Sequence, residues 1–194
     1  MNACFRSIIN IIISAWLLGL PSASHAQPLF DKGWQALLKD NDTLALRLFG
    51  DAYLEAYRKD DTLGKAQSLL YMGICSYGVS YSKGAAYCYR AMEEYKKMEQ
   101  RRPAKALEGR SRCLLLLATI ESRLGNTQKS AALSYEALAG FRNRTDTTHS
   151  LGLIYANLGN INKKRGNRDS ATYYYEQALA EQLRAGDVAY QPGS

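Results

Sequence analysis

The chain has 194 residues, of which 46% are hydrophobic and 10% aromatic, and its formal net charge at pH 7 is +7. This composition is typical of a globular protein and excludes a collagen-like or disordered chain, and the length fits one domain. The chain has only two histidines, His25 and His149, which excludes a His-rich zinc site and a His-Glu-x-x-His protease helix.

The first 26 residues have the pattern of a secretory signal. Arg6 precedes an apolar run over residues 8–20, and Pro21 ends it. Ser24 and Ala26 are the small residues expected before a cleavage point. The run is shorter than the roughly 20 residues of a membrane-spanning helix. We therefore predict a signal peptide over 1–26 and an extracytoplasmic protein, periplasmic or secreted. An uncleaved anchor is the alternative, and we expect membrane contact only in that case or if the chain continues into a span.

Everything from residue 27 to residue 188 is predicted to be helical, followed by a tail over 189–194. A small residue recurs every 40 to 45 positions, at Gly33, Gly73, Ala118 and Gly159. A turn former follows seven positions later, at Asp40, Ser80, Gly125 and Gly166. Further small or space-filling residues follow at twelve, sixteen and nineteen positions, and they include Ala45, Phe49, Ala85, Tyr89, Ser130, Ser134, Ala137, Ala171, Tyr175 and Ala178.

These offsets predict pairs of packed helices. A small residue in the first helix of a pair lets the second helix approach closely, and the later residues face back across that contact. Such a pair has two apolar faces and cannot bury both alone, so neighbouring pairs must stack. The sequence therefore predicts an all-α solenoid of about four antiparallel helix pairs, near 27–62, 66–103, 108–144 and 149–187.

The last of these pairs resembles a tetratricopeptide repeat. The resemblance is carried by Asn157-Leu158-Gly159-Asn160-Ile161, Gly166-Asn167, Ala171, Tyr174-Tyr175 and Ala178-Leu179. Asn162 departs from the family pattern, which usually has an aromatic there, and Ser134 stands where a large side chain is usual. The resemblance implies a right-handed superhelix that binds proteins and performs no catalysis.

The same resemblance implies a binding surface, because the first helices of tetratricopeptide repeats line the concave face. We expect a protein or peptide partner there and no cofactor or metal. Asn side chains can hold a peptide backbone, and Lys or Arg can hold a carboxylate. The opposing interpretation, a merely solvated helix face, stays open. The candidate residues are Trp34, Tyr77, Arg112, Thr119, Arg123, Asn157, Asn160 and Lys164.

Two further functional hypotheses come from other classes. The first is that the chain is not a free-standing binding module but the N-terminal, extracytoplasmic sensory region of a larger membrane signalling protein. That protein would be a histidine kinase or a helix-turn-helix regulator. A hydrolase would depend on His149, but neighbouring Thr148 and Ser150 are better explained as helix caps.

The cation clusters suggest an anionic partner, but we interpret them as helix ends. Arg58-Lys59, Lys96-Lys97 and Arg101-Arg102 are placed where helices are expected to stop, and cations there meet the negative end of the helix dipole. We therefore expect no nucleic-acid partner.

The three cysteines of the helical region, Cys75, Cys88 and Cys113, lie in apolar patterns and are predicted to be buried thiols. Cys75 with Cys88 is the one disulfide pairing that we would test, because an exported protein meets an oxidising compartment.

Overall fold

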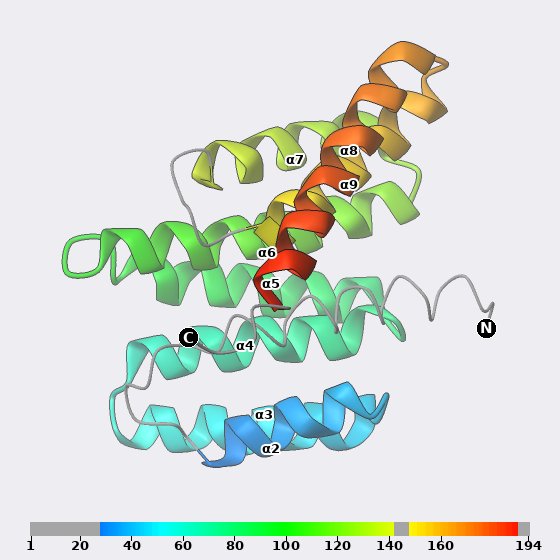
Figure 1. Cartoon of the computed structure of the whole chain (residues 1–194). Coiled ribbons are helices and arrows are strands. Elements are labelled where there is room, and N and C mark those ends of the chain that lie inside the picture. Colours follow the sequence, from blue (N-terminus) through cyan, green and yellow to red (C-terminus); the bar gives the residue numbers. More distant parts are fainter. Residues whose placement is uncertain (1–27, 142–147, 190–194) are drawn as a thin grey trace. The chain divides into compact units, whose positions relative to one another are not determined.

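The computed structural model describes residues 28–141 and 148–189, and the predicted signal peptide and residues 190–194 lie outside this part (Figure 1). The described residues form eight α-helices, and consecutive helices pack as antiparallel pairs. The all-α prediction is confirmed. The chain divides into two compact units near residue 140.

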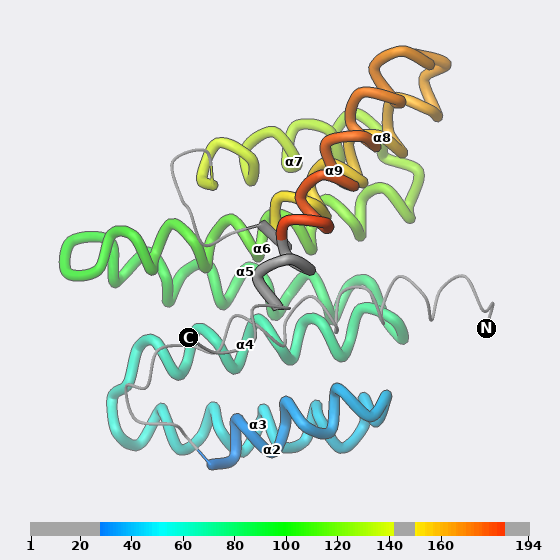
Figure 2. Tube along the Cα trace, viewed as in Figure 1, coloured from blue at the N-terminus to red at the C-terminus, as the bar shows by residue number. Residues whose placement is uncertain are grey.

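The helix bounds follow the predicted pairing. The first unit contains α2 (Pro28–Leu38), α3 (Asp42–Arg58), α4 (Thr62–Tyr77), α5 (Tyr81–Lys96), α6 (Pro103–Arg123) and α7 (Thr127–Phe141). The second contains α8 (Thr148–Lys164) and α9 (Arg168–Ala189). In the first unit α4 contacts both α3 and α5 and also meets α6, so successive pairs lie against one another (Figure 2). We call the first helix of each pair, α2, α4, α6 and α8, an A helix.

Side-chain caps explain where several helices begin. The Asn41 side chain accepts a hydrogen bond from the Leu44 backbone N–H (3.1 Å), and Asp61 accepts one from Gly64 (3.0 Å). Ser80 does the same for Lys83 at 3.4 Å. Each cap satisfies a backbone donor that has no partner inside its helix.

The turn inside a pair has the same backbone in three of the four pairs. Asp40, Gly125 and Gly166 adopt positive φ angles of 55°, 83° and 78°. These are three of the four predicted turn formers. The α4–α5 turn is different, because its second residue, Val79, does not adopt a positive φ angle. The turn has three residues in all four pairs, but α4 ends four residues after Gly73, whereas the other A helices end five residues after their recurring small residue.

The recurring small residues lie where the helices of a pair touch. A Cβ atom on Gly33 would lie 2.9 Å from the Phe49 ring, and one on Gly159 would lie 2.6 Å from the Tyr175 ring. In the third pair the A helix carries Ala118 instead, and the facing residues are small. Ser130 and Ser134 are fully buried there, and the Ser130 hydroxyl donates to the Ala118 carbonyl at 2.8 Å. A glycine thus faces an aromatic ring, and an alanine faces serines.

The second pair corrects the predicted register. We expected Ala85 and Tyr89 to face Gly73, but Tyr89 is 51% exposed and Ala85 is only half-buried. A Cβ on Gly73 would instead lie 3.2 Å from the Gly84 carbonyl oxygen and 3.3 Å from the Cys88 Sγ atom. The facing positions come one residue earlier because α4 ends one residue sooner after Gly73 than the other A helices end after their small residue.

The three cysteines of the helical region are free and buried, as predicted. The Cys88 thiol hydrogen-bonds with Cys113 of the next helix, and the Cys75–Cys88 disulfide, the one pairing that we would have tested, is not formed. Burial raises the pKa of the Cys75 thiol to about 12, so this group stays protonated at neutral pH.

Candidate functional site

The A helices of the first unit share a row of aromatic and charged side chains. Trp34 of α2 lies edge-to-face against Tyr71 of α4, with the ring centroids 5.5 Å apart. The Arg112 guanidinium of α6 lies near Tyr71 and forms an ion pair with Glu108 (Nη2 to Oε1, 2.7 Å). We call Trp34, Tyr71, Glu108 and Arg112 the A-helix row. It crosses three helices that are separate in sequence.

Burial and charge fix the chemistry of this row. Tyr71 is buried, which raises the pKa of its hydroxyl well above the usual value, and the nearby Arg112 charge partly offsets this effect. The Arg112 side chain keeps 27% of its surface exposed, and Trp34 is half-buried. The row therefore presents an indole and a guanidinium to solvent above a neutral phenol.

The other predicted residues of this unit are placed unequally. Tyr77 is 6% exposed, so its ring belongs to the core, and Arg123 is exposed near it and lowers the pKa that burial raises. Thr119 is half-buried and its hydroxyl donates to the Leu115 carbonyl at 2.9 Å. Trp34 packs against Tyr71, on whose hydroxyl the Arg112 charge acts, and Tyr71 was not among the predicted groove residues.

In the second unit the three predicted residues do not form one exposed surface. Asn157 is buried, whereas Asn160 and Lys164 are exposed. The Asn160 Oδ1 atom accepts a hydrogen bond from the Tyr175 hydroxyl at 2.9 Å, so this amide braces α8 against α9. Only Asn160 and Lys164 are therefore placed to meet a partner.

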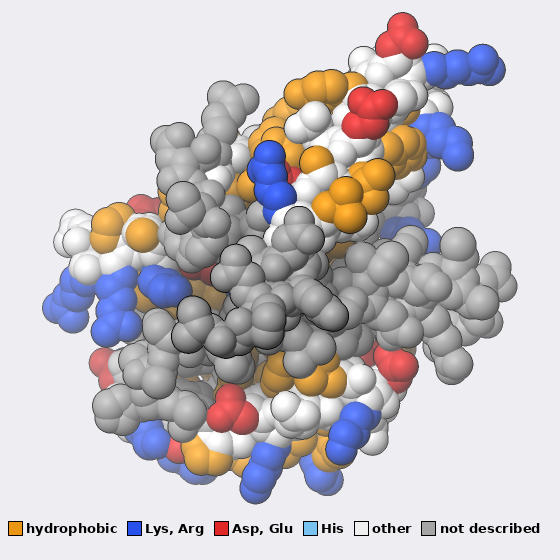
Figure 3. All heavy atoms as spheres, in the orientation of Figure 1, with side chains coloured by type: hydrophobic (Ala, Val, Ile, Leu, Met, Phe, Trp, Pro, Cys, Tyr) orange, Lys and Arg blue, Asp and Glu red, His pale blue; other side chains and the backbone are white. Residues whose placement is uncertain are grey.

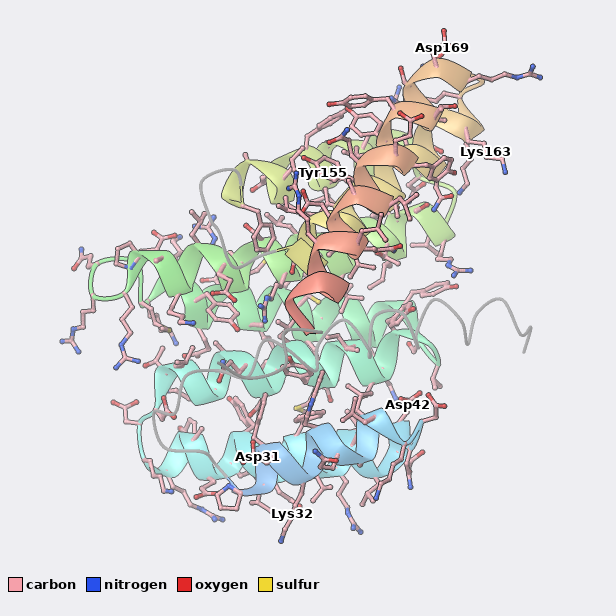
Figure 4. All side chains as sticks on the ribbon, in the orientation of Figure 1. Asp31, Lys32, Asp42, Tyr155, Lys163 and Asp169 are labelled. Carbon is pink, nitrogen blue, oxygen red and sulfur yellow. The ribbon has the colours of Figure 1, made fainter. Side chains whose placement is uncertain are left out.

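A hollow of about 540 Å³ lies at the α8–α9 turn, and none of its lining residues was predicted to bind a partner. Its lining includes two exposed cations, Lys163 and Arg168, together with Thr172 and the Tyr175 ring. Figure 4 shows Lys163 and Asp169 at this end of the α8–α9 pair, with Tyr155 farther along it. The signal available in the sequence was the pair of cations on either side of the turn glycine, Gly166. The chemistry of the hollow suits an anionic or hydrogen-bonding group.

The described side chains were also searched for a metal site. Within residues 28–141 and 150–184, no group of three or more His, Cys, Asp and Glu side chains could hold a metal ion. The His149 side chain, on which the hydrolase hypothesis depends, lies outside the described part. Among the helices that the structure describes, none is both long and apolar enough to span a membrane.

Comparison with known families identifies a repeat region in the C-terminal half of the chain. Residues 110–180 match the tetratricopeptide repeat family. This segment is a tetratricopeptide repeat region. No curated protein matches the sequence. The family assigns no enzymatic activity to the region, and a tetratricopeptide repeat domain suggests a protein–protein interaction module.

The tetratricopeptide repeat region runs from α6 into α9 and so covers the third and fourth helix pairs. Six of the eight predicted groove residues fall inside it, and Trp34 and Tyr77 precede it. The Gly33–Phe49 and Gly159–Tyr175 contacts show the same packing on both sides of residue 110.

Proposed function

We propose that this chain is an exported module that binds a protein or peptide through its A-helix surface, without catalysis. The observation that carries the proposal is the A-helix row, in which Trp34 packs against Tyr71 and the Arg112 charge acts on the Tyr71 hydroxyl. Trp and Arg, which the row presents to solvent, belong to the residue types that most often dominate protein–protein binding energy. The tetratricopeptide repeat region over 110–180 supports the same class of function.

The A-helix row would bind its partner with little rearrangement. Trp34 is held by Tyr71, and Arg112 is held by Glu108, one helical turn away. Side chains that are already ordered lose less conformational entropy when a partner binds. The indole would bury an apolar side chain of the partner, and the guanidinium would donate to a backbone carbonyl or a carboxylate.

Site-specific photocrosslinking in the native host tests which surface binds. A benzoylphenylalanine at Thr119 of α6 should form a crosslink to a discrete protein partner, because this half-buried position lies on an A helix. The matched control places the same probe at Ala139, an exposed position on α7. The proposal fails if both probes capture the same proteins, or if only the control crosslinks.

Substitutions then test the individual residues. Trp34→Ala combined with Arg112→Ala should abolish capture of the Thr119-crosslinked partner, and Asn160→Ala with Lys164→Ala should weaken it. Leu54→Ala, at an exposed site on α3, should leave capture unchanged. Retention of the partner by the Trp34/Arg112 variant would show that the A-helix row is not the binding surface.

Export is tested separately from binding. The protein recovered from the native host should begin at Gln27, because the predicted cleavage point follows Ala26. An intact mass that includes residues 1–26 would exclude a cleaved signal peptide without affecting the proposed binding surface.

A further inference from the structure

The turn between α5 and α6 concentrates positive charge. Its only acidic residue, Glu99, forms an ion pair with Arg110 of α6. Figure 3 shows Lys and Arg side chains gathered at the end of α5 and α6 that carries this turn. The cations over residues 96–105 are all exposed, and they are Lys96, Lys97, Arg101, Arg102 and Lys105.

The helix-dipole interpretation of these cations holds for only part of the turn. Lys96 ends α5, as predicted, and Lys97 is its C-cap. Arg101 and Arg102 do not end a helix, because α6 begins at Pro103. Arg102 is the N-cap of α6, where it provides no side-chain cap bond, and the first turn of α6 contains no acidic residue. Cations at a helix N-terminus face the positive end of the dipole, which is unfavourable.

Neighbouring acids neutralise only some of this charge. Lys97 pairs with Glu94 at 2.7 Å, and Lys105 pairs with Glu108 at 3.6 Å. Among the described residues, Lys96, Arg101 and Arg102 form no ion pair. Asn41 and Asp61 show that the same chain supplies ordinary caps elsewhere. A local arrangement that disfavours folding without visible compensation is expected where a sequence serves binding.

The turn has the chemistry of a contact with a charged plane. It exposes no aromatic side chain on which a nucleic-acid base could stack, and Met98 is buried. It also lacks the large apolar anchor that centres most protein interfaces. Several exposed cations on one turn suit the phosphate groups of a lipid bilayer, which attract each nearby Lys or Arg.

We propose that the α5–α6 turn docks the protein on an anionic phospholipid surface, with Lys96, Arg101 and Arg102 contacting lipid phosphates. Lys96, Arg101 and Arg102 are not members of the A-helix row, so this contact uses other residues. It also differs from membrane insertion, because no apolar segment of the turn enters the bilayer.

Vesicle co-sedimentation of the full chain tests the proposal. Arg101→Glu with Arg102→Glu should lower partitioning onto mixed phosphatidylglycerol and phosphatidylcholine vesicles by at least about tenfold. The matched control is Lys39→Glu with Lys83→Glu, which changes the net charge equally at two exposed sites away from the turn. Vesicles of phosphatidylcholine alone measure the binding due to the apolar N-terminal segment, which both variants should retain.

Thermal unfolding shows whether a loss of lipid binding is caused by misfolding of the variant. The Arg101/Arg102 variant should melt a few degrees higher than the wild type, because the new carboxylates face the positive end of the α6 dipole. Loss of lipid binding together with a higher Tm supports the proposal. Equal loss in the Lys39/Lys83 control, or unchanged binding in the Arg101/Arg102 variant, overturns it. Tighter binding of polyglutamate or an oligonucleotide through the same arginines also overturns it.

Discussion

The first and last helix pairs make the same internal contact but leave it covered to different extents. In the α2–α3 pair the Phe49 ring packs on Gly33 and is 0% exposed, because Tyr71 of α4 stacks on it at 5.0 Å. In the α8–α9 pair the Tyr175 ring packs on Gly159 but is 36% exposed. An aromatic ring against a glycine is therefore enough to pack the two helices of a pair together. Burial of the outer side of that ring requires a further helix, as α4 provides for Phe49.

Truncating the two rings should give the largest difference. Phe49→Ala is expected to destabilise the first unit by about 3–5 kcal/mol, because it leaves a cavity between α2, α3 and α4. Tyr175→Ala should cost about 1 kcal/mol, because the ring is partly solvated and loses less buried area. Urea unfolding followed by circular dichroism measures both, and equal losses would contradict the comparison.

Replacing Gly33 or Gly159 by alanine should cause the next largest loss of stability. Gly33→Ala should cost about 2 kcal/mol, since the enclosed Phe49 ring cannot move away from a new methyl group. Gly159→Ala should cost about 1 kcal/mol, because the exposed Tyr175 ring can swing outward.

A double variant sharpens this prediction. Gly159→Ala combined with Tyr175→Ser reproduces the Ala118–Ser134 arrangement of the third pair and should be less destabilised than the sum of the single variants. The melting temperatures of the two single variants and the double variant complete the cycle. Strict additivity would mean that the two residues do not share a contact.

Replacing glycine by alanine should change stability in different directions in two of the turns. Gly166→Ala should destabilise by about 1 kcal/mol, because the φ of 78° is costly for a residue with a Cβ atom. Gly78→Ala should be neutral or stabilise by about 0.5 kcal/mol, because its φ is −67° and a Cβ there meets nothing within 4 Å. Thermal melts of the two variants check the signs.

Acid should weaken the third pair slightly, which is the smallest effect that we predict. The Lys129 ammonium at 2.6 Å, helped by the Asn126 amide, lowers the pKa of the Glu121 carboxyl in the folded protein. A lowered folded pKa contributes stability above the unfolded pKa of about 4.3, and this stability is lost as pH falls through the folded value. Glu121→Gln should therefore reduce the fall in Tm between pH 6 and pH 3, with Glu136→Gln as an exposed control.

The small-residue pattern made most of the helix pairing predictable, but it could not resolve a shift of one residue. Gly84 and Ala85 are both small, and either fits beside Gly73 in sequence. The residue at which α4 ends decides between them, and the size of the neighbouring side chains does not predict that end. Because α4 ends one residue sooner after its small residue than the other A helices do, Cys88 takes the place of Tyr89 at the contact.

The candidate surfaces were harder to predict, because exposure depends on neighbouring helices. Tyr77 and Asn157 were placed on a surface by alignment within the repeat, yet packing in each unit buries them. The boundary before α6 was misassigned because Arg101-Arg102 followed Lys96-Lys97 and was interpreted as the same helix end. Pro103 was the available signal, since proline is favoured at the first position of a helix.

Tyr95 of α5 and Gly109 of α6 extend the glycine–ring contact across the boundary between two pairs. Tyr95 is buried, and its ring fills the space that a side chain on Gly109 would need. The seam between the second and third pairs is therefore as tightly interlocked as the inside of a pair. A chain cut after α5 would expose this ring to water, so we expect such a fragment to aggregate, whereas a cut within the α4–α5 turn would break up one pair.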